Sequence, residues 1–180
     1  MKKYNNFPLI VMSLAVFLLF SCAGASLLAA ETSSPLEMRL RESLATLPYY
    51  SVFDTLKARV EGTTAVLSGE VTRPELKASA EAAAKRVSDI QEVRNEIEVL
   101  PFSPNDDRIR LDAYRAIYYH PDFTRYAIQA YPPIHIIVKN GDIRLEGSVL
   151  TEADRNLAGI RAKSVPGAFS VKNTLEVVKD

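Results

Sequence analysis

The second half of this chain repeats the first at an offset of 78 residues. Residues 67–71 read LSGEV and return as LEGSV at residues 145–149. Residues 93–99 read VRNEIEV and return as VKNTLEV at residues 171–177, which is the same offset. Two matched segments in one register indicate two copies of a single small module. A chain built in this way is typical of binding and scaffolding proteins.

Each copy begins with a helical pattern that leads into two strands. The helical stretches cover residues 36–47 and the residues from Asp106 onward, where apolar side chains recur every three or four positions. Alternating apolar and polar residues then predict two strands in each copy. The strands meet at Gly62 in the first copy and at Asn140-Gly141 in the second, and these residue types tolerate positive φ.

A second helix and a closing strand complete each copy. Thr72 and Glu75 form a pattern typical of a capping box, and Thr151 followed by Asp154 gives the corresponding start in the second copy. Because strand-helix-strand crossovers are right-handed, both helices are expected on one face of the sheet. The sequence therefore predicts an α+β fold with two tandem α-β-β-α-β modules, each a small three-stranded sheet covered on one face by two helices.

The repeat also predicts the domain boundaries. Module 1 is expected at residues 36–100 and module 2 at residues 106–180, joined by a linker at residues 101–105 that contains Pro101 and Pro104. Modules of this size have small hydrophobic cores. We therefore expect the two modules to dock against each other.

Gly69 and Gly147 fall on the inward face of the second strand of their modules. A glycine inside a strand weakens that strand unless a neighbour needs the space. We interpret both as structural positions at which a helix packs close to the strand backbone. The alternative is a groove in the backbone that receives a ligand.

The first 25 residues have the layout of a secretory signal segment. Two lysines precede an apolar run at residues 9–20, and small residues follow it. The run is shorter than the roughly 20 residues of a membrane span, and a retained anchor is the alternative. Cleavage is expected either before Cys22 or after Ala25, which leaves a short leader at residues 26–35. The sequence therefore predicts an exported protein of the periplasm.

These patterns resemble the BON domain of bacterial cell-envelope proteins. The resemblance rests on the strand ending in LSGEV or LEGSV, the capped helix and the closing V-x-N-x-I/L-x-V, and it covers residues 36–179 in two copies. It implies a non-enzymatic protein that is periplasmic or associated with the outer membrane. The family is linked to phospholipid binding, envelope maintenance and stress response. Residues 19–22 also resemble a bacterial lipobox, which implies lipid attachment at Cys22, although Phe20 departs from that pattern.

Charge and motifs argue against several classes of function. The chain carries 22 basic and 22 acidic residues, so a nucleic-acid partner is not expected. No known catalytic motif is present in the sequence. His120 is explained by a turn, and His135 is expected on the exposed face of the sheet, opposite Ile134 and Ile136. We expect no catalytic residue, no metal, no cofactor and no small-molecule substrate.

One segment of module 2 is unusually rich in aromatic residues. The rings are those of Tyr118, Tyr119, Phe123, Tyr126 and Tyr131. Such rings can form a contact surface that is apolar in its body and polar at its tip, which makes them a candidate binding surface. The alternative is that they fill the gap between the first helix and the sheet. The register of the repeat breaks in this segment, and this favours module 2 as the place of binding.

Two functions agree with these patterns. The first is a binding protein that engages phospholipid or the membrane surface through one module. The alternative is a periplasmic adaptor or scaffold that binds another envelope protein at an open sheet edge or sheet face. An enzyme is disfavoured because the sequence contains no recognised catalytic set.

Overall fold

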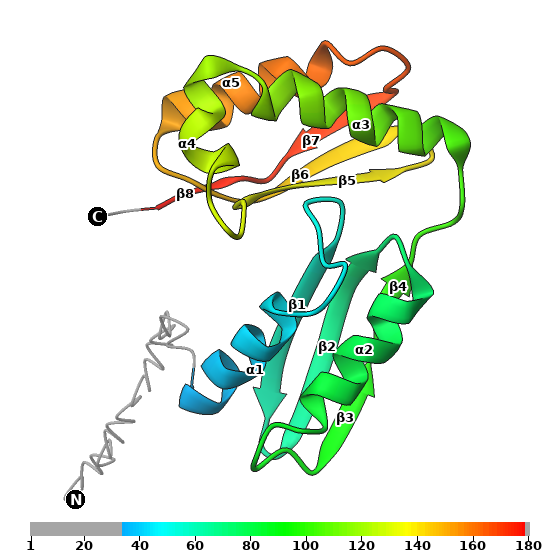
Figure 1. Cartoon of the computed structure of the whole chain (residues 1–180), viewed down its shortest axis with the longest axis vertical. Coiled ribbons are helices and arrows are strands. Elements are labelled where there is room, and N and C mark those ends of the chain that lie inside the picture. The colour runs from blue at the N-terminus through cyan, green and yellow to red at the C-terminus, as the bar shows by residue number, and fades with distance from the viewer. Residues whose placement is uncertain (1–33, 179–180) are drawn as a thin grey trace, which may run out of the picture. The chain divides into compact units, whose positions relative to one another are not determined.

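Two modules of the same topology follow each other in residues 34–178, the part of the chain that the computed structural model describes (Figure 1). Both modules belong to one unit of the structure, residues 33–180. The predicted signal segment at residues 1–25, with Cys22, lies outside the described residues, as does most of the predicted leader.

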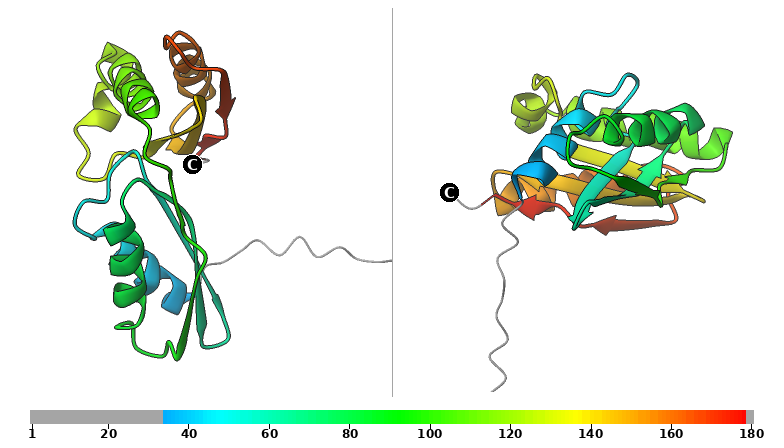
Figure 2. Two further views of the ribbon diagram at one scale, coloured as in Figure 1. Left: turned by 90° about the vertical axis from the view of Figure 1, so that its right-hand side faces the viewer. Right: turned by 90° about the horizontal axis from the view of Figure 1, so that it is seen from below.

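Module 1 is a mixed sheet with two helices on one face (Figure 2). Its elements are α1 (Pro35–Ala45), β1 (Thr55–Glu61), β2 (Thr64–Val71), α2 (Pro74–Ala84), β3 (Glu92–Asn95) and β4 (Glu98–Val99). β1 runs antiparallel to β2, and β3 and β4 both run parallel to β2. The predicted closing strand is therefore present, but it is broken into two short strands.

Module 2 repeats this arrangement with a longer first connection. Its elements are α3 (Pro104–Tyr118), η1 (Pro121–Phe123), α4 (Thr124–Ala127), β5 (Ile134–Lys139), β6 (Asp142–Val149), α5 (Glu152–Lys163), β7 (Ser170–Asn173) and β8 (Glu176–Val177). The strand pairings match those of module 1. The two short helices η1 and α4 occupy the segment where the register of the repeat breaks. The predicted α+β fold of two tandem modules is confirmed.

Each module has its own hydrophobic core between helices and sheet. In module 1, Leu40 and Leu44 of α1 pack with Leu67 of β2. In module 2, Ile109 of α3 packs against the strands, and the same core contains Val52, which precedes β1 in the sequence of module 1. One side chain of module 1 therefore belongs to the core of module 2.

Hydroxyl caps begin three of the helices. Ser34, Ser103 and Thr151 each accept the backbone N–H three residues further on, at 3.2, 3.2 and 3.1 Å. The predicted capping box at Thr72 is wrong. The N-cap of α2 is Arg73, and no side chain caps this helix. The Thr72 hydroxyl instead donates to Asp54 Oδ1 at 2.8 Å, so its hydrogen-bonding capacity is used inside module 1.

The two strand glycines are explained by a neighbouring strand. Gly69 has φ +121° and Gly147 has φ +107°, values that favour glycine. A Cβ on Gly69 would lie 2.2 Å from the carbonyl oxygen of Thr55, and one on Gly147 would lie 1.9 Å from that of Pro133. The prediction of a closely packed helix is therefore wrong, because the backbone beside the strand takes the space.

Candidate functional site

The segment before β1 lies against the edge of the module 2 sheet. We call residues 50–54 the docking loop. Its Val52 carbonyl oxygen accepts a hydrogen bond from the Ile136 backbone N–H at 2.7 Å. β5 is an edge strand with β6 as its only strand partner among the described residues, so this N–H points out of the sheet. Exposed edge groups of this kind invite pairing with other chains, and here the docking loop covers one of them.

Apolar side chains of the docking loop reinforce this contact. Val52 is only 9% exposed and packs with the buried residues of module 2. The Phe53 ring meets the Tyr114 ring of α3 edge-on, with 6.0 Å between their centroids. Full burial of a valine side chain contributes about 2 kcal/mol. The contact therefore has a hydrophobic component as well as a backbone hydrogen bond.

His135 completes the contact with the docking loop. Its Nδ1 lies 2.6 Å from the carbonyl oxygen of Asp54, and its ring stacks on Tyr50 at a centroid distance of 5.6 Å. The prediction that His135 lies exposed on the sheet face is wrong, because module 1 covers it. Burial lowers the pKa of His135, and burial also raises the pKa of Tyr50 to about 12.

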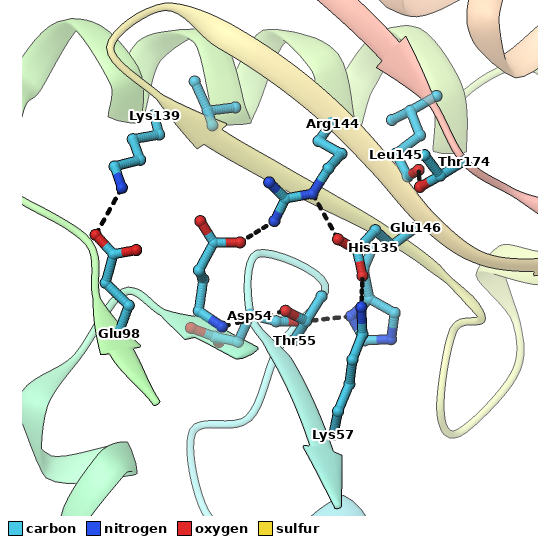
Figure 3. A network of polar contacts seen from close by, with 12 residues as sticks. Asp54, Thr55, Lys57, Glu98, His135, Lys139, Arg144, Leu145, Glu146 and Thr174 are labelled. Atoms are coloured by element: carbon cyan, nitrogen blue, oxygen red, sulfur yellow. Dashed lines mark hydrogen bonds and ion pairs between the residues drawn. The ribbon is translucent and has the colours of Figure 1, made fainter. Parts of the chain in front are cut away.

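Ion pairs link the two modules on the side of the open sheet faces (Figure 3). Lys57 Nζ lies 2.7 Å from Glu146 Oε2, and Lys139 Nζ lies 2.6 Å from Glu98 Oε1. A third pair joins Arg144 to Glu70. The three pairs join module 1 to module 2 at separate points of the junction, which restrains the relative orientation of the two modules.

The Glu146 carboxylate pairs with two cations, Lys57 and Arg144. Burial favours its protonated form, but hydrogen bonds from Lys57 and Arg144 outweigh burial and lower the pKa of Glu146. Glu146 is thus a charged acceptor for both modules. Sequence reasoning missed these partners, because the periodicity of one module gives no information about which residues face the other module.

The predicted aromatic surface divides into a buried and an exposed part. Tyr118, Phe123 and Tyr126 are 4%, 0% and 1% exposed, so the gap-filling alternative describes them. The Tyr118 hydroxyl donates to the Ile134 carbonyl oxygen at 2.6 Å. Tyr119 and Tyr131 are 74% and 60% exposed, and these two remain available for contacts.

A polar cluster fixes the connection that carries these rings. The Tyr126 hydroxyl donates to Asp154 Oδ2 at 2.8 Å, and Arg125 forms an ion pair with the same carboxylate. Burial opposes ionisation of Asp154, but hydrogen bonds from Thr151, Tyr126 and Arg125 lower its pKa. The cluster ties α4 to the start of α5.

Two exposed apolar residues near this cluster were missed by the sequence analysis. Ile128 directly follows α4 and is 79% exposed, and Leu150 follows β6 and is 54% exposed. The Leu150 backbone N–H donates to the Tyr126 hydroxyl at 2.8 Å, which places Leu150 beside α4. Neither residue has a sequence signal, since isolated aliphatic residues are common on protein surfaces.

Within residues 34–178, no group of three or more His, Cys, Asp or Glu side chains is arranged to hold a metal ion. None of the helices in this range is both long and apolar enough to cross a bilayer.

Comparison with protein families identifies the modules. The model of the BON domain matches residues 33–101 and again residues 105–179. This chain therefore belongs to the BON-domain family and contains two BON domains in tandem. Membership of this family indicates a binding or scaffolding role associated with the bacterial envelope, and it points to a non-catalytic protein.

Comparisons with individual proteins add little to this assignment. No curated protein matches the chain. One similar solved structure is that of CdsD, a structural protein of the type III secretion system of Chlamydia trachomatis, at 15% identity and a TM-score of 0.31, covering 79% of this chain and 63% of that chain. Another is the C-terminal domain of CdsD, at 10% identity and a TM-score of 0.29, covering 81% of this chain and 98% of that chain.

Proposed function

We propose that this protein is an exported, non-enzymatic envelope protein that binds a phospholipid surface through module 2. The observation that supports the proposal is the exposed apolar group formed by Ile128, Tyr131 and Leu150. Large apolar side chains in a loop gain free energy when they enter the interfacial region of a bilayer, and tyrosine is well suited to that region.

Buried residues fix the two segments that carry these side chains. Phe123 and Tyr126 are buried, and the Tyr126 hydroxyl binds both Asp154 of α5 and the Leu150 backbone N–H. An anchored loop loses little conformational entropy when it meets a surface, so the exposed side chains can contribute their transfer free energy to binding. Module 1 offers a smaller surface at this position, since its docking loop contacts module 2 and only Tyr49 of residues 46–54 is a largely exposed aromatic residue.

Co-sedimentation with liposomes tests the proposal. The purified protein is expected to pellet with vesicles of mixed zwitterionic and anionic phospholipid. Ile128→Ser combined with Tyr131→Ser is expected to reduce the bound fraction several-fold. Ile160→Ser is the matched control, because Ile160 is a 62% exposed isoleucine on α5. Absence of pelleting with every vesicle composition contradicts the proposal.

We also propose that the signal segment directs the protein to the periplasm and that Cys22 carries a lipid anchor. The sequence of residues 19–22 supports this proposal. Intact-mass spectrometry of the protein purified from its membrane fraction distinguishes acylated Cys22 from cleavage after Ala25. A mass that corresponds to an unmodified chain beginning at Ser26 contradicts lipid attachment.

A further inference from the structure

A groove of about 430 Å³ runs along the edge of β1 in module 1. It lies between α1 and β1, and we call it the edge groove; Leu44, Ala45, Tyr50, Leu56 and Ala58 form its apolar lining, and Arg41 and Lys57 add two basic side chains. β1 is an edge strand, like β5 in module 2. Apolar side chains therefore line a groove beside a strand edge, which is the setting in which proteins bind extended peptides.

The internal repeat relates the edge groove to the contact between the modules. At the offset of 78 residues, Ala58 corresponds to Ile136, whose N–H binds the docking loop. Ala58 pairs with Leu67 in the same register in which Ile136 pairs with Leu145. The N–H of Ala58 is therefore expected to point out of the sheet, as that of Ile136 does.

The helix that borders the groove, α1, also corresponds to α3 of module 2. Leu40 and Leu44 face the core of module 1 as Ile109 and Ala113 face that of module 2. This alignment places Ala45 at the position of Tyr114, which meets Phe53 of the docking loop. The edge groove of module 1 is thus the counterpart of the site that residues 52–54 occupy on module 2.

We propose that the edge groove binds an extended segment of another protein in the same way that module 2 binds the docking loop. The segment supplies a backbone carbonyl oxygen to the Ala58 N–H and places a β-branched or aromatic side chain against Leu44 and Leu56. This interaction surface goes beyond the proposed membrane contact, because it lies on module 1 and uses none of the exposed residues of the module 2 loop.

The charged groups around the groove indicate the flanking chemistry of the partner. Lys57 takes the place of His135 and lines the groove, as does Arg41 of α1. Lys57 forms an ion pair with Glu146 at the junction, and Arg41 pairs with Glu37 and donates from Nε to the Ala58 carbonyl oxygen at 3.5 Å. Two cationic side chains beside the groove favour an acidic group on the segment that enters it. We therefore infer that the bound segment carries an acidic residue beside its apolar side chain.

The charges disfavour a second copy of this chain as the partner. If module 2 of one copy docked on module 1 of the next in the observed geometry, Glu176 would take the place of Glu98 and Glu61 that of Lys139. An acidic pair would replace an ion pair. The groove is instead continuous with the existing junction, because Tyr50 lines the groove and also stacks on His135.

Amide chemical shifts of the ¹⁵N-labelled protein test the proposal with a synthetic peptide of residues 50–55, Tyr-Ser-Val-Phe-Asp-Thr. Saturable shifts are expected in β1 and the second half of α1. A peptide with aspartate in place of its valine is expected not to bind. Ala58→Pro removes the edge N–H and is expected to weaken peptide binding about tenfold. Ala45→Trp fills the groove while leaving the strand intact, and it is expected to have a similar effect.

Other outcomes overturn the proposal. Shifts confined to β5 and α3 would show that the peptide displaces the docking loop and does not bind the edge groove. The absence of shifts at millimolar peptide contradicts an extended-segment site. A concentration-dependent increase in mass that Ala45→Trp abolishes assigns the groove to a second copy of the chain. Liposome binding by Ala45→Trp is expected to be unchanged, so the two proposals fail independently.

Discussion

Module 1 and module 2 share a topology, yet their first strands have different neighbours. The edge of β5 is covered by the docking loop, whereas the edge of β1 borders an open groove. The side chains follow this difference, because β5 presents Ile134 and Ile136 where β1 presents Leu56 and Ala58. Two copies of one module thus diverge where one copy serves as the ligand of the other.

The segment between the first helix and the first strand also differs between the two modules. In module 1 it is short, and buried Asp54 holds it by accepting from the Ser51 and Thr72 hydroxyls at 2.7 and 2.8 Å. In module 2 it is longer, and buried Asp154 holds it through Tyr126. Each module therefore uses one buried carboxylate to fix this connection, but module 2 exposes Ile128, Tyr131 and Leu150 there, whereas module 1 exposes only Tyr49.

The largest expected effect on stability comes from the strand glycine that both modules share. Gly69→Ala is expected to lower the free energy of unfolding by about 3 kcal/mol or more, because it adds a positive-φ strain to a clash with the Thr55 carbonyl. Gly62→Ala is the matched control, since a Cβ there meets no atom within 4 Å, and its expected cost is about 1 kcal/mol. Urea denaturation measures both. Equal costs at the two positions would contradict the role of the strand backbone.

A smaller effect on stability is expected for the docking loop, which covers the edge of β5 only. Val52→Ala is expected to cost about 1–2 kcal/mol, because it removes two methyl groups from the core of module 2. Hydrogen exchange of the Ile136 amide is expected to accelerate, while that of β2 amides stays unchanged. Val178→Ala serves as the control at a half-exposed valine. If exchange in module 2 does not change, the docking loop does not stabilise it.

Acidification is expected to weaken the junction. The pKa of His135 is lowered by burial in the folded state, so the unfolded chain binds a proton first. The stability from neutral His135 is complete above about pH 6.5 and declines as the pH falls below that value. Exchange of the Ile136 amide between pH 7.5 and 5 measures the decline, after correction for the intrinsic rate. His135→Asn is expected to remove this dependence, whereas a slope that persists assigns it to another group.

The smallest effect on stability is expected for the ion pair between Lys139 and Glu98. Glu98→Gln is expected to cost about 0.5 kcal/mol, because both Glu98 and Lys139 are largely exposed. A double-mutant cycle with Lys139→Met isolates the coupling, which is expected to shrink at 1 M salt. A coupling well above 1 kcal/mol would show that this pair has a larger share in orienting the modules.

Much of the fold follows from local patterns. The helical face with Leu40 and Leu44, the turn at Asn140-Gly141 and the α+β topology were all predicted from periodicity and turn chemistry. The predicted capping box at Thr72 does not form, because Arg73 is the N-cap of α2 and the Thr72 hydroxyl donates to Asp54. A local signal fails where a partner from a distant part of the chain competes for the same group.

The candidate sites depended more on tertiary structure. The sequence marked the aromatic segment as a candidate surface, but exposure separates Tyr119 and Tyr131 from the three buried rings. The sequence could not distinguish them, because their ring chemistry is similar and only the packing of the module 2 core decides which rings are covered. The same holds for His135, which alternation placed on an open face that module 1 in fact covers.

The sequence by itself determined that this chain is two BON domains in tandem, because a repeated pattern of hydrophobic residues and glycines specifies each module locally. Tertiary structure alone decided that Val52 fills the edge of β5 while the edge of β1 borders an open groove. The physical reason is that edge pairing, burial and ion pairing between modules join residues about 80 positions apart, and no local pattern encodes such contacts.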